Sequence, residues 1–331
     1  PRPKLAPPSD LLYWFSGTDV SESSLAYQWV RLTSNACLRR DTKSDSSHNL
    51  LRDQLYESDL AAGKNGTANR AVFSIPCNTH SVCQFRKYKN LRVLRTDQEI
   101  MGCADLPPSD RAKVNASNLL TQRSCNMAQC IHDQGGLFII ENPVRRNDPD
   151  GPWKRFNSGK FPRHGSLWQV KCVVDLARAT KARVLHVPLC WFAHEASDVC
   201  SVEQKYITLM YSPELEPALQ FLRAARCEHR VHEKKAIGFN DDGSSRSEPT
   251  AAYPAELNRV LPRALAYPNK CASDESWAKG PPDEPVLNVT GPSDSPLVDS
   301  PAAKGLPGDH GPHSARGAVV ARGHSVNMRR L

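Results

Sequence analysis

Two short apolar runs that each end in polar residues constrain the fold of this chain most. The first is Ala71-Val-Phe-Ser-Ile-Pro-Cys77 and the second is Leu137-Phe-Ile-Ile-Glu-Asn-Pro143. Runs of this length and composition are typical of strands buried on both faces, as in parallel sheets. In an open α/β sheet, ligands collect beyond the carboxyl ends of the strands. A thiol at Cys77 and a carboxylate at Glu141 therefore stand where catalytic groups are expected.

Strand and helix patterns alternate along the rest of the chain. Strands are predicted at 11–15, 36–40, 183–190 and 206–211, and helices at 21–32, 50–62, 109–133, 166–179, 215–225 and 254–265. This alternation predicts an α/β fold with a mostly parallel sheet and helices on both faces. We expect one domain over residues 11–266, preceded by a disordered segment at 1–10.

The composition changes in residues 267–331, which are rich in Pro, Gly, Ser, Asp and Ala and poor in aromatic residues. Such a segment cannot bury enough apolar surface to offset its chain entropy, so we expect a disordered tail. The tail holds equal numbers of basic and acidic residues, and the net charge of +8 therefore belongs to the preceding domain. A basic domain is compatible with a nucleic-acid partner, and equally with an ordinary basic surface.

The eleven cysteines follow no regular spacing. This favours a reducing, intracellular compartment, which would be the nucleus in a eukaryote. No apolar run approaches the roughly 20 residues that span a bilayer, so no membrane insertion is expected. The sequence leaves the oligomeric state open.

Four short motifs follow one another along the chain: Phe15-Ser-Gly17, Asp41, Pro76-Cys77 and Glu141-Asn142-Pro143. In this order they resemble the Rossmann-type DNA cytosine-5 methyltransferases, and more closely the divergent methyltransferase-like proteins of phages and protists. The resemblance covers roughly residues 11–266 and includes the later segments Lys205-Tyr-Ile-Thr208 and Ala252-Tyr-Pro-Ala-Glu-Leu257. It implies a Rossmann-like methyltransferase fold and S-adenosylmethionine as the cofactor.

The resemblance also implies which residues hold the cofactor. The loop after the first strand would wrap the methionine part of S-adenosylmethionine, and glycine suits such a loop because backbone must approach the ligand closely. Asp41 would accept hydrogen bonds from the ribose hydroxyls, the general role of an acidic residue after the second strand; Asp45 is an alternative. The expected cofactor-binding residues are Phe15, Gly17, Thr18, Asp41 and Pro76.

In the same comparison Cys77 would be the nucleophile that adds to C6 of cytosine, with Cys83 as a second candidate. Nearby positive charge, for example from Arg86, Lys87 and Lys89, would favour the thiolate. Glu141 would hydrogen-bond the base at N3 and donate a proton, because a buried carboxyl group has a raised pKa. Asn142 would orient the loop, and Lys205 and Thr208 would line the active site. For Cys77 and Glu141 alike, an ordinary strand-end residue is the alternative interpretation.

Basic and aromatic residues gather in two further segments. Phe85–Arg95, and Arg145-Arg146 with Trp153-Lys-Arg155, have the composition of loops that contact phosphates and stack on bases. Together with the resemblance, they favour DNA over RNA as the partner.

Three departures from the resembled pattern favour a second hypothesis. The cofactor loop has a single glycine, one proline precedes Cys77 where the family has two, and the span between Pro213 and Tyr253 is short for a target-recognition domain. The alternative is a catalytically degenerate domain, derived from a mobile element, that binds nucleic acid or protein. A third hypothesis keeps the cofactor and methylates RNA or a small molecule.

Cys227-Glu-His229-Arg-Val-His232 has three residues of the types that bind zinc, with Cys190 or Cys200 as a possible addition. Structural zinc sites need four ligands. Because only three are clustered in the sequence, we predict no metal site.

Overall fold

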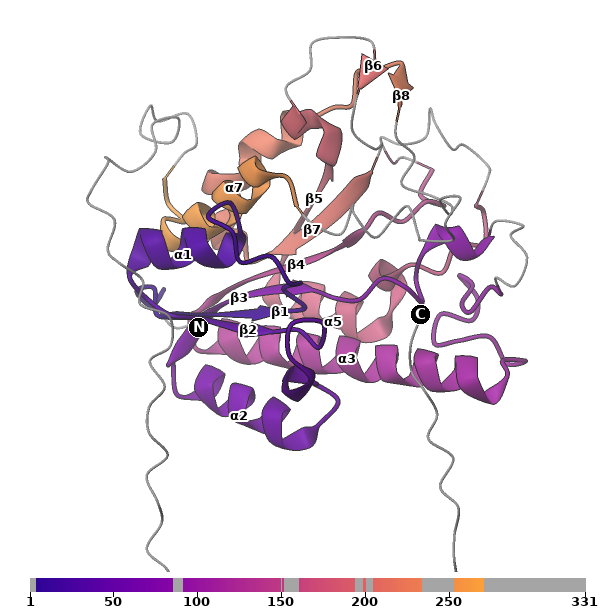
Figure 1. The fold of residues 1–331 in the computed structure, drawn as a ribbon, viewed down its shortest axis with the longest axis horizontal. Helices are drawn as coiled ribbons and strands as arrows, with labels where there is room; N and C mark the ends of the chain where they lie inside the picture. The colour runs from indigo at the N-terminus through magenta and orange to yellow at the C-terminus, as the bar shows by residue number, and fades with distance from the viewer. Residues whose placement is uncertain are drawn as a thin grey trace, which may run out of the picture. The chain divides into compact units, whose positions relative to one another are not determined.

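Six strands form one mixed sheet in the order β2-β1-β3-β4-β7-β5 (Figure 1). In the computed structural model the described residues are 4–85, 92–149, 151, 161–193, 199–200, 205–233 and 253–270. They belong to a unit that spans Pro1–Asp283, and the second unit, Glu284–Leu331, lies outside them. The strands are β1 (Asp10–Trp14), β2 (Cys37–Arg40), β3 (Ala68–Ser74), β4 (Leu137–Pro143), β5 (Arg183–Pro188) and β7 (Tyr206–Tyr211).

The sheet is mostly parallel, as predicted. β1 pairs in parallel with β2 and β3, and β3 pairs in parallel with β4. β7 runs antiparallel to both of its neighbours, β4 and β5. A separate short pair joins β6 (Val199–Cys200) and β8 (Val231–His232) in parallel.

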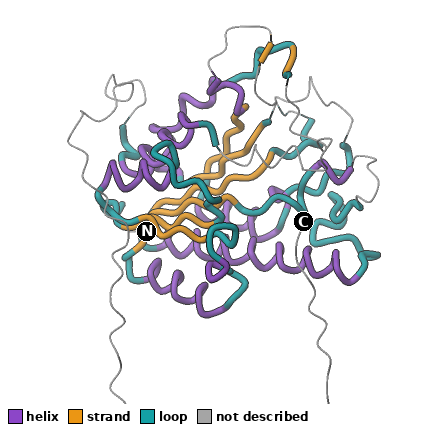
Figure 2. The backbone as a smooth tube through the Cα atoms, viewed as in Figure 1, coloured by secondary structure: helices purple, strands orange, loops and turns teal. Residues whose placement is uncertain are grey.

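Helices cover both faces of the sheet, which confirms the predicted α/β layering (Figure 2). The α-helices are α1 (Leu25–Thr33), α2 (Asp53–Lys64), α3 (Pro108–Asp133), α5 (Lys171–Thr180), α6 (Glu216–Leu219) and α7 (Ala255–Ala266). Short 3-10 turns occur at Ser46–His48, Val82–Phe85, Leu167–Gln169, Leu189–Ala193, Pro213–Leu215 and Gln220–Ala224. The continuous helix predicted at 215–225 is thus broken into short turns, and Pro217 fixes the start of its one α-helical turn.

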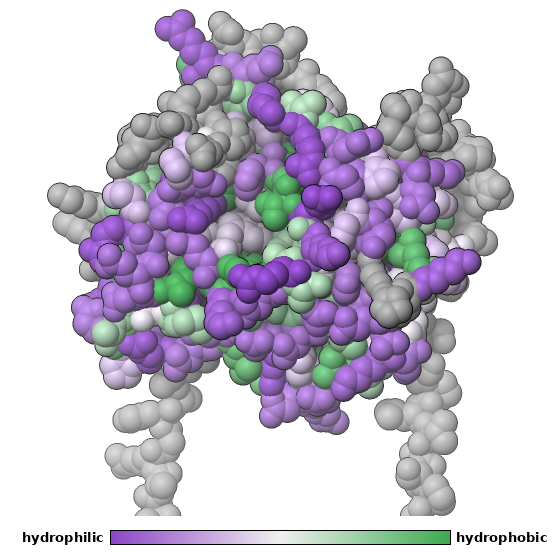
Figure 3. Space-filling view, turned by 180° about the vertical axis from the view of Figure 1, so that it is seen from behind, coloured by the Kyte–Doolittle hydropathy of each residue, from purple (hydrophilic) through white to green (hydrophobic). Residues whose placement is uncertain are grey.

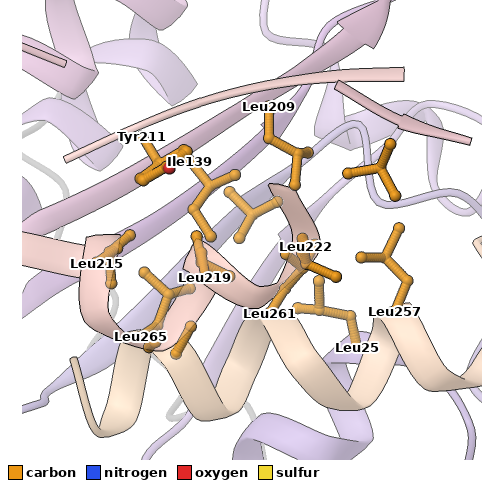
Figure 4. Packing of buried hydrophobic residues seen from close by; sticks show 14 of the residues in the cluster. Leu25, Ile139, Leu209, Tyr211, Leu215, Leu219, Leu222, Leu257, Leu261 and Leu265 are labelled. Atoms are coloured by element: carbon orange, nitrogen blue, oxygen red, sulfur yellow. The ribbon is translucent and has the colours of Figure 1, made fainter. Parts of the chain in front are cut away.

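One face of the sheet packs against α1, α6 and α7. Figure 4 shows how leucines of these helices meet the side chains of β4 and β7. α7 supplies Leu257, Leu261 and Leu265, which recur at the spacing of one helical face and are fully buried. The helix continues past Pro262 to Ala266.

The opposite face packs against α2, α3 and α5. Its core includes Phe73 of β3, Phe138 and Ile140 of β4, and Met127 and Ile131 of α3. Both central strands are therefore covered on each side, and all but the last residue of each is buried. This confirms that the two apolar runs are interior strands.

A buried carboxylate links β1, β2 and α2. Asp59 of α2 is 1 % exposed and accepts hydrogen bonds from Trp14 Nε1 at 2.9 Å and from the Arg40 guanidinium at 2.7 Å. A buried charge is tolerated when it is paired and hydrogen-bonded in this way. The ion pair fixes α2 against the end of β2, next to the predicted cofactor loop.

Residues 4–10, which we expected to be disordered, make specific contacts instead. Asn69 donates to Pro7 O, Ser9 donates to Gly66 O, and Asp10 is the first residue of β1. The buried guanidinium of Arg70 donates to Ala6 O and to Leu265 O, so it joins this segment to the end of α7. Sequence composition missed this because several of the contacts are made by backbone carbonyls, which no side-chain pattern records. The predicted disordered tail lies outside the described residues from 271 onward.

Replacing Leu261 by Ala should lower the free energy of unfolding by about 2–5 kcal/mol, because a fully buried leucine leaves a cavity. Denaturation in urea measures the change. Leu119→Ala is the matched control: Leu119 is 41 % exposed on α3, and its loss should cost about 0.5 kcal/mol or less. Equal effects of the two substitutions would contradict the docking of α7.

Candidate active site

The carboxyl ends of β1, β2, β3 and β4 lie at one edge of the sheet, since these four strands are parallel. Residues predicted to act in catalysis or binding lie at or shortly after each of these ends. Phe15–Thr18 follow β1, Asp41 follows β2, Pro76-Cys77 lie two residues beyond β3, and Glu141-Asn142 lie near the end of β4. The order of the strands thus gathers segments that are far apart in the sequence.

The loop after β1 has a backbone conformation that a ligand can approach closely. Phe15 and Gly17 both have positive φ angles, 61° and 69°. A Cβ atom at Gly17 would meet no atom within 4 Å, so the space beside this backbone is open to a ligand. Thr18 is exposed next to it. These features fit a loop that wraps a bound group.

Asp41 ties this loop to the end of β2. Its Oδ2 accepts a hydrogen bond from the Gly17 N–H at 2.8 Å, and its Oδ1 accepts from the Lys43 N–H at 2.7 Å. A carboxylate has about four acceptor positions, so capacity for ribose hydroxyls remains. The alternative, Asp45, caps the 3-10 turn Ser46–His48 by accepting from Ser47 N. Both carboxylates thus accept from a backbone N–H two residues on, but only Asp41 also contacts the loop after β1.

Asn142 joins the ends of β3 and β4. Its side chain is buried, and Nδ2 donates a hydrogen bond of 2.6 Å to the backbone carbonyl of Ile75. Ile75 directly precedes Pro76 and Cys77, and Cys77 is partly exposed. The contact holds the loop that carries the thiol against the strand that carries Glu141.

The segment after Cys77 is anchored by buried polar groups. Arg95 is 1 % exposed and donates to Thr79 Oγ1, Ile100 O, Asn118 Oδ1 and Val114 O. It therefore holds the loop onto α3, and the interpretation of Arg95 as a phosphate contact is wrong. Burial and the nearby Arg95 lower the pKa of His80 to about 3, so this histidine is a neutral part of the same structure.

Glu141 lies in a buried polar group on the face of the sheet covered by α1 and α7. Its Oε2 accepts a hydrogen bond of 2.9 Å from the Tyr253 hydroxyl, which also lies 2.6 Å from Ser74 Oγ. Burial raises the pKa of Glu141, while the positive charge of Lys205 and the Tyr253 hydrogen bond act in the opposite direction. A raised pKa is typical of carboxyl groups that act as proton donors.

Lys205 and Thr208 lie at the start of β7, beside β4. Thr208 is opposite Asn142 in the ladder, and its hydroxyl lies 2.9 Å from His186 Nδ1. Lys205 precedes the strand, and its charge reaches Glu141. The structure therefore brings Lys205 into the neighbourhood of Glu141.

Tyr253 and Ser74 are members of this polar group that the sequence did not reveal. Successive residues of a strand point to opposite faces, so Glu141 faces Tyr253 while Asn142 faces the other helix layer. Tyr253-Pro254 immediately precedes α7, and its segment belongs to the resemblance, but no role was predicted for the tyrosine. Nothing in the sequence pairs it with a strand 112 positions away.

Several predicted contacts fall outside the described residues: Arg86, Lys87, Lys89 and Trp153-Lys-Arg155. The side chain of Cys83 lies outside them as well. Of the other basic positions, Arg145 bonds to Asn147 Oδ1 and the Arg146 backbone bonds to His164 Nδ1.

Two shallow surface hollows of the described residues lie away from these strand ends. One is bordered by Lys4–Pro8 and Arg70, and the other by Phe85, Thr96 and Arg163. The face in Figure 3 is largely hydrophilic, with small separate apolar patches. Among the described helices, none is long and apolar enough to cross a membrane.

Comparison with protein-family models, curated protein sequences and solved structures found no match to this chain.

The raised pKa of Glu141 predicts a pH-dependent stability difference between the wild type and Glu141→Gln. Between the unfolded and folded pKa values, the folded state binds more protons than the unfolded state, so stability falls as the pH rises. Relative to Glu141→Gln, the wild type should lose free energy of unfolding as the pH increases from about 4.3, the ordinary pKa of glutamate. The difference should level off above the folded pKa.

Urea denaturation at a series of pH values tests this expectation. Glu57→Gln, which changes an exposed glutamate on α2, is the matched control. A flat difference for Glu141→Gln would mean that the carboxyl group is solvated in the folded protein.

Proposed function

We propose that this chain is an S-adenosylmethionine-dependent methyltransferase that methylates C5 of cytosine in DNA through an adduct with Cys77. The observation that carries the proposal is the hydrogen bond from Asn142 Nδ2 to Ile75 O. It joins the two strand ends that bear Cys77 and Glu141, the nucleophile and acid of the resembled enzymes.

The strand pattern adds support for a methyltransferase fold. β7 alone runs against the other five strands of the sheet, between β4 and the edge strand β5. A mostly parallel sheet with helices on both faces is compatible with the Rossmann-like fold that the resemblance implies. The order of motifs along the chain and the order of strands across the sheet are thus compatible with one family.

The cofactor has a suitable place at the ends of β1 and β2. Gly17 leaves open space beside its backbone, and Asp41 offers acceptor positions for ribose hydroxyls. Phe15 and Thr18 border the same loop, and Pro76 lies at the end of the neighbouring strand β3. When bound, S-adenosylmethionine supplies an electrophilic methyl group.

The protein residues would act on the base in three steps. The Cys77 thiolate adds to C6, which opens the C5–C6 double bond, while Glu141 donates a proton to N3. C5 then carries enough negative charge to accept a methyl group. Loss of the C5 proton to water and departure of the thiolate restore the double bond, and Glu141 recovers its proton. Tyr253 and Lys205 hold and polarise Glu141 during these steps.

Calorimetric titration of the full chain with S-adenosylmethionine tests the cofactor site. Asp41→Ala should weaken binding about 10- to 100-fold, because hydrogen bonds to a charged group contribute about 1.5–3 kcal/mol. Asp45→Ala removes a carboxylate from the same loop and should leave the affinity unchanged. A folded wild type that does not bind would favour the degenerate domain, and nucleic-acid binding without the cofactor would support it directly.

DNA that contains 5-fluorocytosine tests the nucleophile. Fluorine at C5 cannot leave as a proton, so the bond between Cys77 and C6 should persist and shift the protein in a denaturing gel. Cys77→Ser should abolish the adduct, whereas Cys130→Ser, at a partly buried thiol of α3, should retain it. An adduct that survives in Cys77→Ser would assign the nucleophile elsewhere. RNA and free cytosine analogues in parallel distinguish the substrate classes.

A further inference from the structure

Four potential metal ligands lie together outside the candidate active site. Cys190 belongs to the 3-10 turn Leu189–Ala193 that follows β5. Cys227, His229 and His232 lie on the segment after Gln220–Ala224, and His232 ends β8. Their ligand atoms, two thiol sulfurs and two imidazole nitrogens, all lie within 4.8 Å of one another. The fold thus supplies the fourth ligand that the sequence cluster lacks.

The distances suit a tetrahedral ion. Cys227 Sγ lies 3.2 Å from His232 Nε2 and 4.0 Å from His229 Nδ1. With metal–ligand bonds of about 2.0–2.3 Å, zinc places its ligand atoms roughly 3.5 Å apart. Small side-chain rotations therefore suffice to close all four atoms around one ion.

Three of the four residues are shielded from water, and His232 is partly exposed. Cys190 is 0 % exposed, Cys227 is 2 % exposed and His229 is 8 % exposed. Two thiolates in this setting would balance the charge of a divalent ion, and imidazole nitrogens complete a set that favours zinc over magnesium or calcium. Four protein ligands leave no open position, which is the arrangement of a structural and not a catalytic site.

We propose that Cys190, Cys227, His229 and His232 bind one structural zinc ion. This proposal replaces the prediction from the sequence that the chain has no metal site. The ion fastens the segment that carries Cys227–His232 to the end of β5. The only described strand pairing of that segment is the two-residue ladder between β6 and β8. Zinc binding there contributes folding free energy, as in other small structural sites. The inference does not depend on the proposed methyltransferase activity.

Elemental analysis of the full-length protein, expressed with zinc in the medium and purified without chelators, is the first test. We expect a single zinc ion per chain. Cys190→Ser and His229→Ala should lower zinc affinity by more than about 100-fold, beyond the loss seen for residues that only orient a ligand. Competition with a chromogenic chelator measures that change.

Cys37→Ser and His48→Ala change the same residue types outside the cluster and should keep both the stoichiometry and the affinity. Full zinc content in Cys190→Ser or His229→Ala would overturn the assignment of the ligands. A stoichiometric metal other than zinc would overturn the identity of the ion.

A measurement on the wild type alone covers the case in which the variants fail to fold. Bound zinc should protect Cys190 and Cys227 from alkylation, and removal of zinc with a chelator should expose them, with the modified sites identified by mass spectrometry. Cys37 should react equally in both states. A folded wild type that takes up no zinc, or whose two thiols react alike with and without it, would overturn the proposal.

Discussion

The burial of β3 and β4 on both faces is the constraint on which the rest of the structure depends. An interior strand must satisfy its backbone groups within the sheet and cover both sides with apolar helices. α1 and α7 do this on one face, and α2, α3 and α5 on the other. Polar side chains are therefore excluded from the middle of these strands and concentrate at their ends. The candidate active site is a consequence of that exclusion.

The pleat of β4 points the side chains of its last two polar residues to opposite faces of the sheet. Glu141 points to the face of α7, where Tyr253 and Ser74 meet it, whereas Asn142 points to the opposite face and bonds to Ile75 O. One residue can therefore be held in a dry environment that raises its pKa while its neighbour fixes the adjacent loop. Two roles of such different chemistry sit next to each other because a strand alternates its side chains.

The sequence predicted the central strands, the long helix α3 and the edge at which the polar residues gather, because apolar periodicity is a local property. It also placed Asp41 directly after the second strand, and the structure has Asp41 there, at the end of β2. The segment Phe85–Arg95 was expected to contact phosphates, but its last residue, Arg95, lies inside and donates to backbone carbonyls. The ordered segment before β1 was missed for the same reason, since Ala6 and Pro7 contribute carbonyl oxygens and no distinctive side chains.

The sequence by itself determined the fold class and the positions of Cys77, Glu141 and Asn142 at strand ends, because these follow from short-range patterns. The tertiary structure alone decided that Tyr253 meets Glu141 and that Cys190 joins Cys227, His229 and His232. In both cases the partners are distant along the chain, and their contact depends on which helix or turn packs over which strand. Packing energy is shared among many apolar residues, so no local pattern records which polar groups it will bring together.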